Sequence, residues 1–255
     1  GLTPVQISVY RGEAHLELKE FEQALESFES ALANDANSVR ALIGAAQVHA
    51  NAGKLDEALG MLQRAVSVDS TDARAWWLIG NVLLRQGDLP KASEAYERAL
   101  QEAPGSLSQV QRHRVIVSLI ESYLSMGQAE RARQHLVELQ RLIPDAPATR
   151  LLAARAAMLE QDYSGAIAET QKVLSATPEL VQARLLLGMA LVANGDLNQA
   201  EAQLGRVVRE WPENLEARKL LAQVLLRSGR EHAAAELLRS MGASELDDPQ
   251  IGSLR

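Results

Sequence analysis

The stretch N-G-D-L-N-Q-A at residues 194–200 decides the fold, because variants of it recur along the whole chain. Examples are Q-G-D-L-P-K-A at 86–92 and A-G-K-L-D-E-A at 52–58. The seven copies end at Ala24, Ala58, Ala92, Ala132, Ala166, Ala200 and Ala234. Successive copies are 34 residues apart, except for the step of 40 residues between Ala92 and Ala132. A fixed period of this length predicts a repeat architecture.

Each copy joins two segments with helical apolar periodicity. The first segment ends at a residue that is glycine in five copies: Lys19, Gly53, Gly87, Gly127, Gln161, Gly195 and Gly229. Glycine suits the left-handed conformation that closes a helix. The second segment stops near a proline in four copies: Pro104, Pro144, Pro178 and Pro212. Because proline cannot continue a helix, each copy predicts a helix, a turn and a second helix.

This 34-residue pattern resembles the tetratricopeptide repeat. The shared features are the alanine that ends each copy and a small residue at the eighth position of six units: Gly12, Ala46, Gly80, Ala154, Gly188 and Ala222. The resemblance implies an all-α fold, a right-handed α-solenoid of about seven repeats. The predicted units are 5–38, 39–72, 73–106, 113–146, 147–180, 181–214 and 215–248. Since one unit cannot bury its apolar face alone, we expect a single array over residues 1–255.

The later units differ from the repeat pattern at one position. Arg150, Arg184 and Arg218 stand where the family often has tryptophan or leucine, as at Trp76. The carboxy-terminal half is therefore the more divergent half.

A six-residue insertion at 107–112 interrupts the period. It predicts either a longer loop or a longer first helix in the fourth unit. Ser106 and Gln109 have the Ser-x-x-Gln spacing of a capping box, which can start a helix there. We favour the lengthened helix.

Composition and motifs argue against several functions. The net charge is −7, without the basic excess that nucleic-acid binding usually needs. There is no cysteine, phosphate-binding loop, nucleophile elbow or H-E-x-x-H motif. His15 and His49 share one repeat position, and we interpret them as packing residues rather than metal ligands. We therefore expect no enzyme activity, no cofactor, no metal and no nucleic-acid partner. No apolar stretch is long enough to span a membrane.

The first helix of each unit lines the inner, concave face of tetratricopeptide solenoids, and this face is the predicted binding site. Arg40, Arg74 and Arg114 recur at one position, and Trp, Met and Arg are enriched at interfaces. The alternative is that these residues pack against neighbouring repeats or pair with nearby glutamates. The candidate partner-binding residues are Arg40, Ile43, Gln47, Arg74, Trp77, Asn81, Arg114, Val117, Glu121, Leu151, Arg155, Met158, Leu185, Met189 and Lys219.

The predicted function is a non-catalytic scaffold that binds a protein or peptide segment on this concave face. One alternative is the repeat domain of a larger enzyme, such as a glycosyltransferase. Another is a polysaccharide-associated scaffold, in which the arginines meet an anionic sugar polymer. Because solenoid ends usually need polar caps, we also expect end-to-end dimers.

The amino-acid sequence of three stretches, at 11–24, 78–92 and 217–229, resembles that of the repeat-rich lipoproteins associated with exosortase sorting and exopolysaccharide systems of Gram-negative bacteria. The resemblance implies a periplasmic or outer-membrane-associated protein of exopolysaccharide and biofilm assembly; the alternative location is the cytoplasm. The chain starts at Gly1 rather than at methionine, so we interpret it as part of a longer protein.

Overall fold

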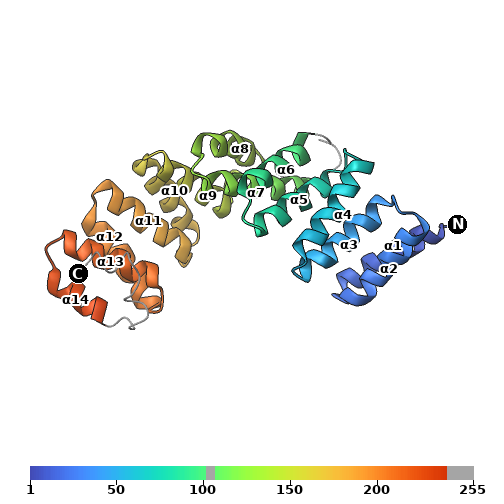
Figure 1. Ribbon diagram of the computed structural model, residues 1–255. Coiled ribbons are helices and arrows are strands. Elements are labelled where there is room, and N and C mark those ends of the chain that lie inside the picture. Colours follow the sequence, from blue (N-terminus) through green and yellow to red (C-terminus); the bar gives the residue numbers. More distant parts are fainter. Residues whose placement is uncertain (102–106, 240–255) are drawn as a thin grey trace. The chain divides into compact units, whose positions relative to one another are not determined.

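The structure is a computed structural model that describes residues 1–101 and 107–239, and within these ranges it contains helices and no strand (Figure 1). The chain divides into two compact units, Gly1–His135 and Leu136–Arg255, which we describe separately as unit 1 and unit 2. Unit 1 contains α1 (Pro4–Glu17), α2 (Phe21–Asn34), α3 (Val39–Asn51), α4 (Leu55–Val68), α5 (Ala73–Arg85), α6 (Leu89–Gln101) and α7 (Gln109–Ser125). The boundary falls within α8 (Ala129–Leu142). Unit 2 contains α9 (Pro147–Leu159), α10 (Tyr163–Ala176), α11 (Val181–Asn194), α12 (Leu197–Glu210), α13 (Leu215–Arg227) and α14 (Glu231–Arg239).

Helices that follow one another in the chain pack against one another in both units. In unit 1, each helix from α1 to α7 contacts the next, and α3 also contacts α1 and α5. Unit 2 repeats this order from α9 to α14, and α11 also contacts α9 and α13. The odd-numbered helices thus form one layer of each unit and the even-numbered helices the other. The prediction of an all-α solenoid of helix pairs is confirmed; a single continuous array over the whole chain stays a prediction.

Helix α7 shows how the insertion is accommodated. It has 17 residues, whereas the other odd-numbered helices have 13 or 14, so the predicted lengthening is confirmed. Its cap is two residues later than predicted. Ser108 accepts a hydrogen bond from the Gln111 backbone N–H (3.3 Å), and the Gln111 side chain accepts one from the Ser108 N–H (2.9 Å). The predicted cap Ser106 lies outside the described residues, and Gln109 is the first residue of the helix.

The ends of the chain bear on the predicted dimer. At the amino terminus, Ile7 and Tyr10 of α1 are exposed apolar side chains. At the carboxy terminus, the residues after Arg239 lie outside the described part of the chain, including the end of the predicted seventh unit. The end-to-end dimer stays a prediction. None of the described helices is both long and apolar enough to cross a membrane.

Close approach between helices depends on glycines that face aromatic rings. The Phe28 side chain of α2 is fully buried between α1 and α3. A Cβ atom added to Gly12 would lie 2.6 Å from this ring, and one added to Gly44 would lie 2.3 Å from it. A Cβ atom added to Gly80 of α5 would likewise lie 2.4 Å from the Tyr96 ring of α6. Non-bonded carbon atoms do not approach one another this closely, so a larger side chain at any of these glycines would push the helices apart.

Arg184 of unit 2 stands at the repeat position of Trp76 and makes the same kind of hydrogen bond. In unit 1, the Trp76 indole Nε1–H donates to the backbone carbonyl of Ser70, six residues earlier (2.8 Å). In unit 2, a guanidinium N–H of Arg184 donates to the carbonyl of Pro178, also six residues earlier. Arg184 is only 5% exposed and also donates to the Gln203 side chain (3.0 Å). Although its sequence diverges at this position, α11 is therefore still hydrogen-bonded through Arg184 to the loop that precedes it.

Two turns have an unfavourable residue at the position of the helix-closing glycine. Lys19 and Gln161 adopt φ angles of 61° and 62°, beside 70–89° for the five glycines at this position. The left-handed conformation costs a residue with a Cβ atom free energy that glycine does not lose. The sequence period correctly located these turns, although it could not show how two side chains tolerate them.

We predict that Gly44→Ala lowers the free energy of unfolding by about 1–3 kcal/mol, because the added methyl group overlaps the buried Phe28 ring. Gly60→Ala is the matched control. Gly60 is exposed on α4 with open space around it, so alanine there should raise stability by about 0.5–1 kcal/mol through helix propensity. Urea unfolding followed by circular dichroism measures both. Equal effects of the two substitutions would contradict the steric explanation.

We also predict that Gln161→Gly raises the free energy of unfolding by about 0.5–1 kcal/mol, because glycine adopts the positive φ of this turn without steric cost. Gly195→Gln, at the equivalent turn of the next repeat, should lower it by a similar amount. The same urea titrations test this pair. A destabilised Gln161→Gly variant would show that the Gln161 side chain makes a stabilising contact of its own.

Candidate partner-binding site

Two adjoining hollows lie over the odd-numbered helices of unit 1. The smaller has a volume of about 210 Å³ and is lined by Glu13, Arg40, Ile43, Gly44, Gln47, Arg74, Trp77, Leu78 and Gln111. The larger has a volume of about 490 Å³ and is lined by Leu16, Glu17, Lys19, Phe21, Ala46, Gln47, Ala50, Asn51, Leu62, Leu78, Asn81, Val82 and Arg85. Gln47 and Leu78 line both, so the hollows adjoin along α3 and α5. We call them together the odd-helix groove.

The two hollows differ in chemistry. The smaller one lies toward the amino-terminal ends of α3 and α5, where Arg40 and Arg74 face it. The larger one lies toward their carboxy-terminal ends, and many of its lining residues are apolar, with Phe21 39% exposed beside it and Leu62 buried. The smaller hollow is therefore mainly charged and polar, whereas the larger one combines an apolar surface with the charged Glu17, Lys19 and Arg85.

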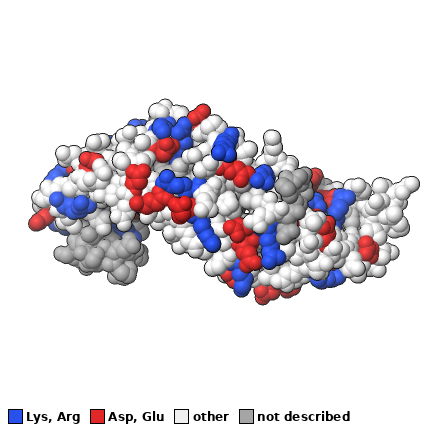
Figure 2. All heavy atoms as spheres, turned by 90° about the horizontal axis from the view of Figure 1, so that it is seen from above, with Lys and Arg blue, Asp and Glu red and all other residues white. Residues whose placement is uncertain are grey.

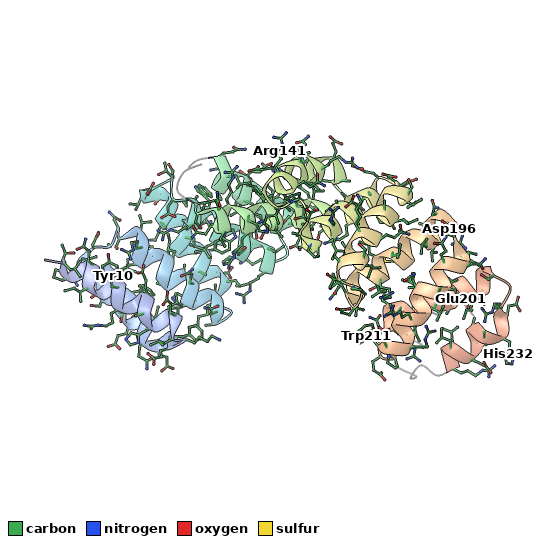
Figure 3. The ribbon with its side chains drawn as sticks, turned by 180° about the vertical axis from the view of Figure 1, so that it is seen from behind. Tyr10, Arg141, Asp196, Glu201, Trp211 and His232 are labelled. Atoms are coloured by element: carbon green, nitrogen blue, oxygen red, sulfur yellow. The ribbon has the colours of Figure 1, made fainter. Side chains whose placement is uncertain are left out.

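Both arginines of the smaller hollow are held by a carboxylate along one edge. Arg40 donates from Nε (3.2 Å) and Nη2 (2.6 and 2.9 Å) to Glu13, and its guanidinium lies 4.6 Å from the centre of the Tyr10 ring of α1, which Figure 3 labels. Arg74 donates from Nε (3.4 Å) and Nη2 (3.0 Å) to Asp72. Pairing with a nearby glutamate, the alternative for these arginines, is thus observed for Arg40. The pairs orient the guanidinium groups without filling all their donor positions.

The adjacent tryptophans have different surroundings. Trp76 bonds the preceding loop, and Arg98 lies over its ring at 4.8 Å. Trp77 lines the smaller hollow and is partly exposed. Its indole Nε1–H is buried and has no acceptor among the residues that the structure describes. Trp76 therefore serves the fold, and Trp77 remains available at the groove.

A buried tyrosine holds one polar group of the larger hollow in place. The Tyr96 hydroxyl of α6 donates to the Asn81 side-chain oxygen (2.8 Å), and Asn81 lines the hollow. Burial raises the pKa of Tyr96 to about 12; the hydrogen bond with Ser118 acts against this rise, and the nearby Glu121 carboxylate adds to it. The side chain therefore stays a neutral donor over the physiological pH range.

The structure brings together six of the nine candidate residues of unit 1. Arg40, Ile43, Gln47, Arg74 and Trp77 line the smaller hollow, and Gln47 and Asn81 the larger one. The other three lie on α7, outside both hollows: Arg114 and Glu121 are exposed, and Val117 is partly exposed. The predicted arginine stripe is therefore present in the groove as a pair rather than as three arginines.

The candidates of unit 2 lie on a more apolar surface. Arg155 is exposed, whereas Leu151, Met158, Leu185, Met189 and Lys219 are partly buried. Met158 packs against the buried Ala154 and Ala157, and Leu185 packs against a cluster that contains Leu187. Packing between repeats therefore accounts for part of their burial, as in the alternative interpretation.

Some groove residues escaped prediction. Glu13 occupies the ninth position of its 34-residue repeat, as Gln47 and Asn81 do in theirs, so the repeat register could have predicted Glu13 as a groove residue. Phe21 and Leu62 belong to even-numbered helices, and only the tertiary structure brings them to the larger hollow. His15, which we interpreted as a packing residue, contacts the Glu20 carboxylate (2.6 Å). No cluster of three metal-ligating side chains occurs within residues 1–101 and 107–239.

Comparison with known proteins agrees with this architecture. One family model described as tetratricopeptide repeat matches residues 9–72 and 43–106, and a second matches 83–157, 157–210 and 191–255. The general transcriptional corepressor trfA of Dictyostelium discoideum is 33% identical over 85 residues, which span 33% of this chain and 6% of that protein.

Two solved structures share the fold. A tetratricopeptide repeat protein from Parabacteroides merdae superposes with a TM-score of 0.72 at 17% identity, over 98% of this chain and 97% of that one. YrrB, described as a TPR protein with an unusual peptide-binding site, gives a TM-score of 0.65 at 20% identity, over 76% of this chain and 97% of that one.

We predict an alkaline sensitivity that depends on Tyr96. The folded state raises the pKa of this hydroxyl above its unfolded value of about 10. Its contribution to stability is therefore complete below about pH 10 and is lost as the pH rises toward about 12. Between about pH 9 and 11.5, Tyr96→Phe should lose about 1–2 kcal/mol less unfolding free energy than the unmodified chain. Urea titrations across this range test it, and parallel losses in both proteins would contradict it.

Proposed function

Because the chain belongs to the tetratricopeptide-repeat family, we propose that it is a protein-binding scaffold that holds an extended segment of a partner protein in the odd-helix groove of unit 1. The observation that carries this proposal is the continuity of the groove. Its two hollows share Gln47 and Leu78, and residues of the odd-numbered helices α1, α3, α5 and α7 line them. A ligand that fills both hollows must extend along these helices.

The composition of the groove supports a protein partner. Trp and Arg are enriched in interface cores, and Trp77, Arg40 and Arg74 lie in one hollow. Polar groups with fixed orientation, such as Asn81, can select the backbone of a bound segment, while the apolar hollow accepts a side chain. The peptide-binding site named for the structurally similar YrrB supports the same kind of ligand on this fold.

The setting in which the scaffold acts follows from the sequence resemblance. We propose that its partner belongs to envelope or exopolysaccharide assembly in a Gram-negative bacterium, and that the scaffold lies in the periplasm or at the outer membrane. The resemblance of the stretches at 11–24, 78–92 and 217–229 to exosortase-associated repeat lipoproteins supports this placement.

Blocking the groove tests the proposed function. Gln47 lines both hollows and is partly exposed, so Gln47→Trp should fill the groove without disturbing the core. Peptides enriched from a random display library on the unmodified protein should bind the variant at least tenfold more weakly, a loss of about 1.4 kcal/mol. Fluorescence polarisation of the labelled peptides measures the affinity.

Gln63→Trp is the matched control, because Gln63 is exposed on the even-numbered helix α4 and lines neither hollow. This variant should bind the peptides as the unmodified chain does. Thermal unfolding by circular dichroism shows whether both variants fold. Unchanged binding to a folded Gln47→Trp variant would exclude the odd-helix groove as the site.

A further inference from the structure

We infer that the segment bound in the odd-helix groove is acidic and carries one large apolar side chain, so that its acidic part meets Arg40 and Arg74 and its apolar side chain enters the larger hollow. This inference rests on the proposed function and adds the chemical class of the partner. Four observations support it. They are the charge of the groove, the arginine donors that the carboxylate partners do not use, the exposed apolar surface of the larger hollow and the distance between the two hollows.

The groove has the opposite charge to the protein as a whole. Its lining contains the cations Arg40, Arg74, Lys19 and Arg85 and the anions Glu13 and Glu17, a formal charge of +2, whereas the chain carries −7. Asp72, which holds Arg74 from outside the lining, brings the formal charge of the groove to +1. Glu13 and Asp72 balance Arg40 and Arg74, so this surplus belongs to Lys19 and Arg85 of the larger hollow. On the surface seen in Figure 2, cationic and anionic side chains are interspersed. An electropositive groove on an acidic protein favours a segment with negative charge.

The two arginines of the smaller hollow have donor groups that their carboxylate partners do not use. Glu13 and Asp72 take the Nε and Nη2 edges, so the Nη1 groups of Arg40 and Arg74 lie outside these ion pairs. Tyr10 also contacts the Arg40 guanidinium, through its ring and a side-chain hydrogen bond. Each arginine side chain is about two-fifths exposed, so a ligand can reach it. Because its carboxylate partner fixes its orientation, each arginine loses little conformational freedom when it binds. Carboxylate oxygens are the acceptors that bind guanidinium groups most strongly.

The apolar part of the segment belongs in the larger hollow. Among its lining residues, Phe21 is exposed and Leu62 is buried, and Ala46 and Ala50 of α3 contribute only small side chains. Its volume of about 490 Å³ exceeds that of a leucine or phenylalanine side chain. Covering Phe21 with such a side chain removes apolar surface from water on both partners.

The distance between the hollows limits the spacing in the partner. On α3, the smaller hollow extends from Arg40 to Gln47 and the larger one from Ala46 to Asn51. At about 1.5 Å per helical residue, their centres are about 8 Å apart and their far ends about 16 Å. An extended chain advances about 3.3 Å per residue. The acidic residue and the apolar residue should therefore be about two to five positions apart.

The first experiment selects ligands without assuming their sequence. A library of random dodecapeptides displayed on phage is selected on the full chain, and the recovered sequences are compared with the unselected library. We expect enrichment of Asp or Glu at two to five positions from Leu, Phe, Ile or Met. Binding of a synthetic peptide from this set should weaken about tenfold between about 0.05 and 0.5 M salt, because salt screens exposed charges.

The second experiment uses the two partners of one ion pair. Arg40→Gln removes a cation that contacts the peptide and should weaken its binding about tenfold. Glu13→Gln removes the competing anion and should strengthen binding several-fold. Arg11→Gln is the matched control, because Arg11 is exposed on α1 and lines neither hollow; its affinity should change less than twofold. If both Arg40→Gln and Glu13→Gln weaken binding, the pair has only a structural role and the inference is overturned.

The outcomes separate this inference from the proposed function. If the selected peptides are basic or uncharged but Gln47→Trp still abolishes their binding, the inference fails and the scaffold function stands. If no peptide is enriched, both fail. If the full chain binds the anionic polysaccharide alginate in an Arg40-dependent way and enriches no peptide, the occupant is a sugar polymer, and the inference is again overturned.

Discussion

The contact between a glycine and a buried ring is the constraint on which the rest of unit 1 depends. Phe28 lies between Gly12 and Gly44, so that one ring of α2 fixes its distance to both α1 and α3. Tyr96 against Gly80 does the same for α5 and α6. Because each ring is fully buried and interiors pack densely, the helices have little freedom to shift. This spacing places the odd-numbered helices side by side and leaves the groove open on one face of their layer.

The same contacts link the core to the groove. Tyr96 packs its ring on Gly80 and uses its hydroxyl to hold Asn81 in the larger hollow. One side chain thus spaces two helices and also orients a binding group. The ion pairs of Arg40 and Arg74 contribute differently. Their side chains are about two-fifths exposed, so each pair stabilises the fold by no more than about 1 kcal/mol. Their main effect is to orient donor groups at the smaller hollow.

Unit 2 keeps the helix pairing with different chemistry. The replacement of tryptophan by Arg184 retains the hydrogen bond to a carbonyl six residues earlier, with Gln203 as a second acceptor. Arg150 at the equivalent position instead pairs with Asp145 and Glu169. A repeat position therefore tolerates a change from an aromatic to a cationic residue when the neighbouring helix or loop supplies an acceptor. The sequence difference reflects altered support of a loop rather than a different fold.

The sequence by itself determined the helix pairs, their turns and the register of the inner helices. The reason is physical: a left-handed turn favours glycine, an apolar stripe needs a fixed period, and both are local properties that repeat every 34 residues. The register was enough to choose Arg40, Gln47 and Trp77, which the structure brings into one hollow. The same register also chose Val117, which lies outside both hollows, because register alone does not show where a hollow ends.

Only the tertiary structure decided the depth, charge and lining of the groove. The contribution of Phe21 and the ion pair between Arg40 and Glu13 each depend on residues that meet across helices. Such contacts carry no periodic pattern in the sequence, because they arise from the packing of one helix against another. The period therefore specified which helix surface is open, and the side chains that meet across helices decided what that surface can bind.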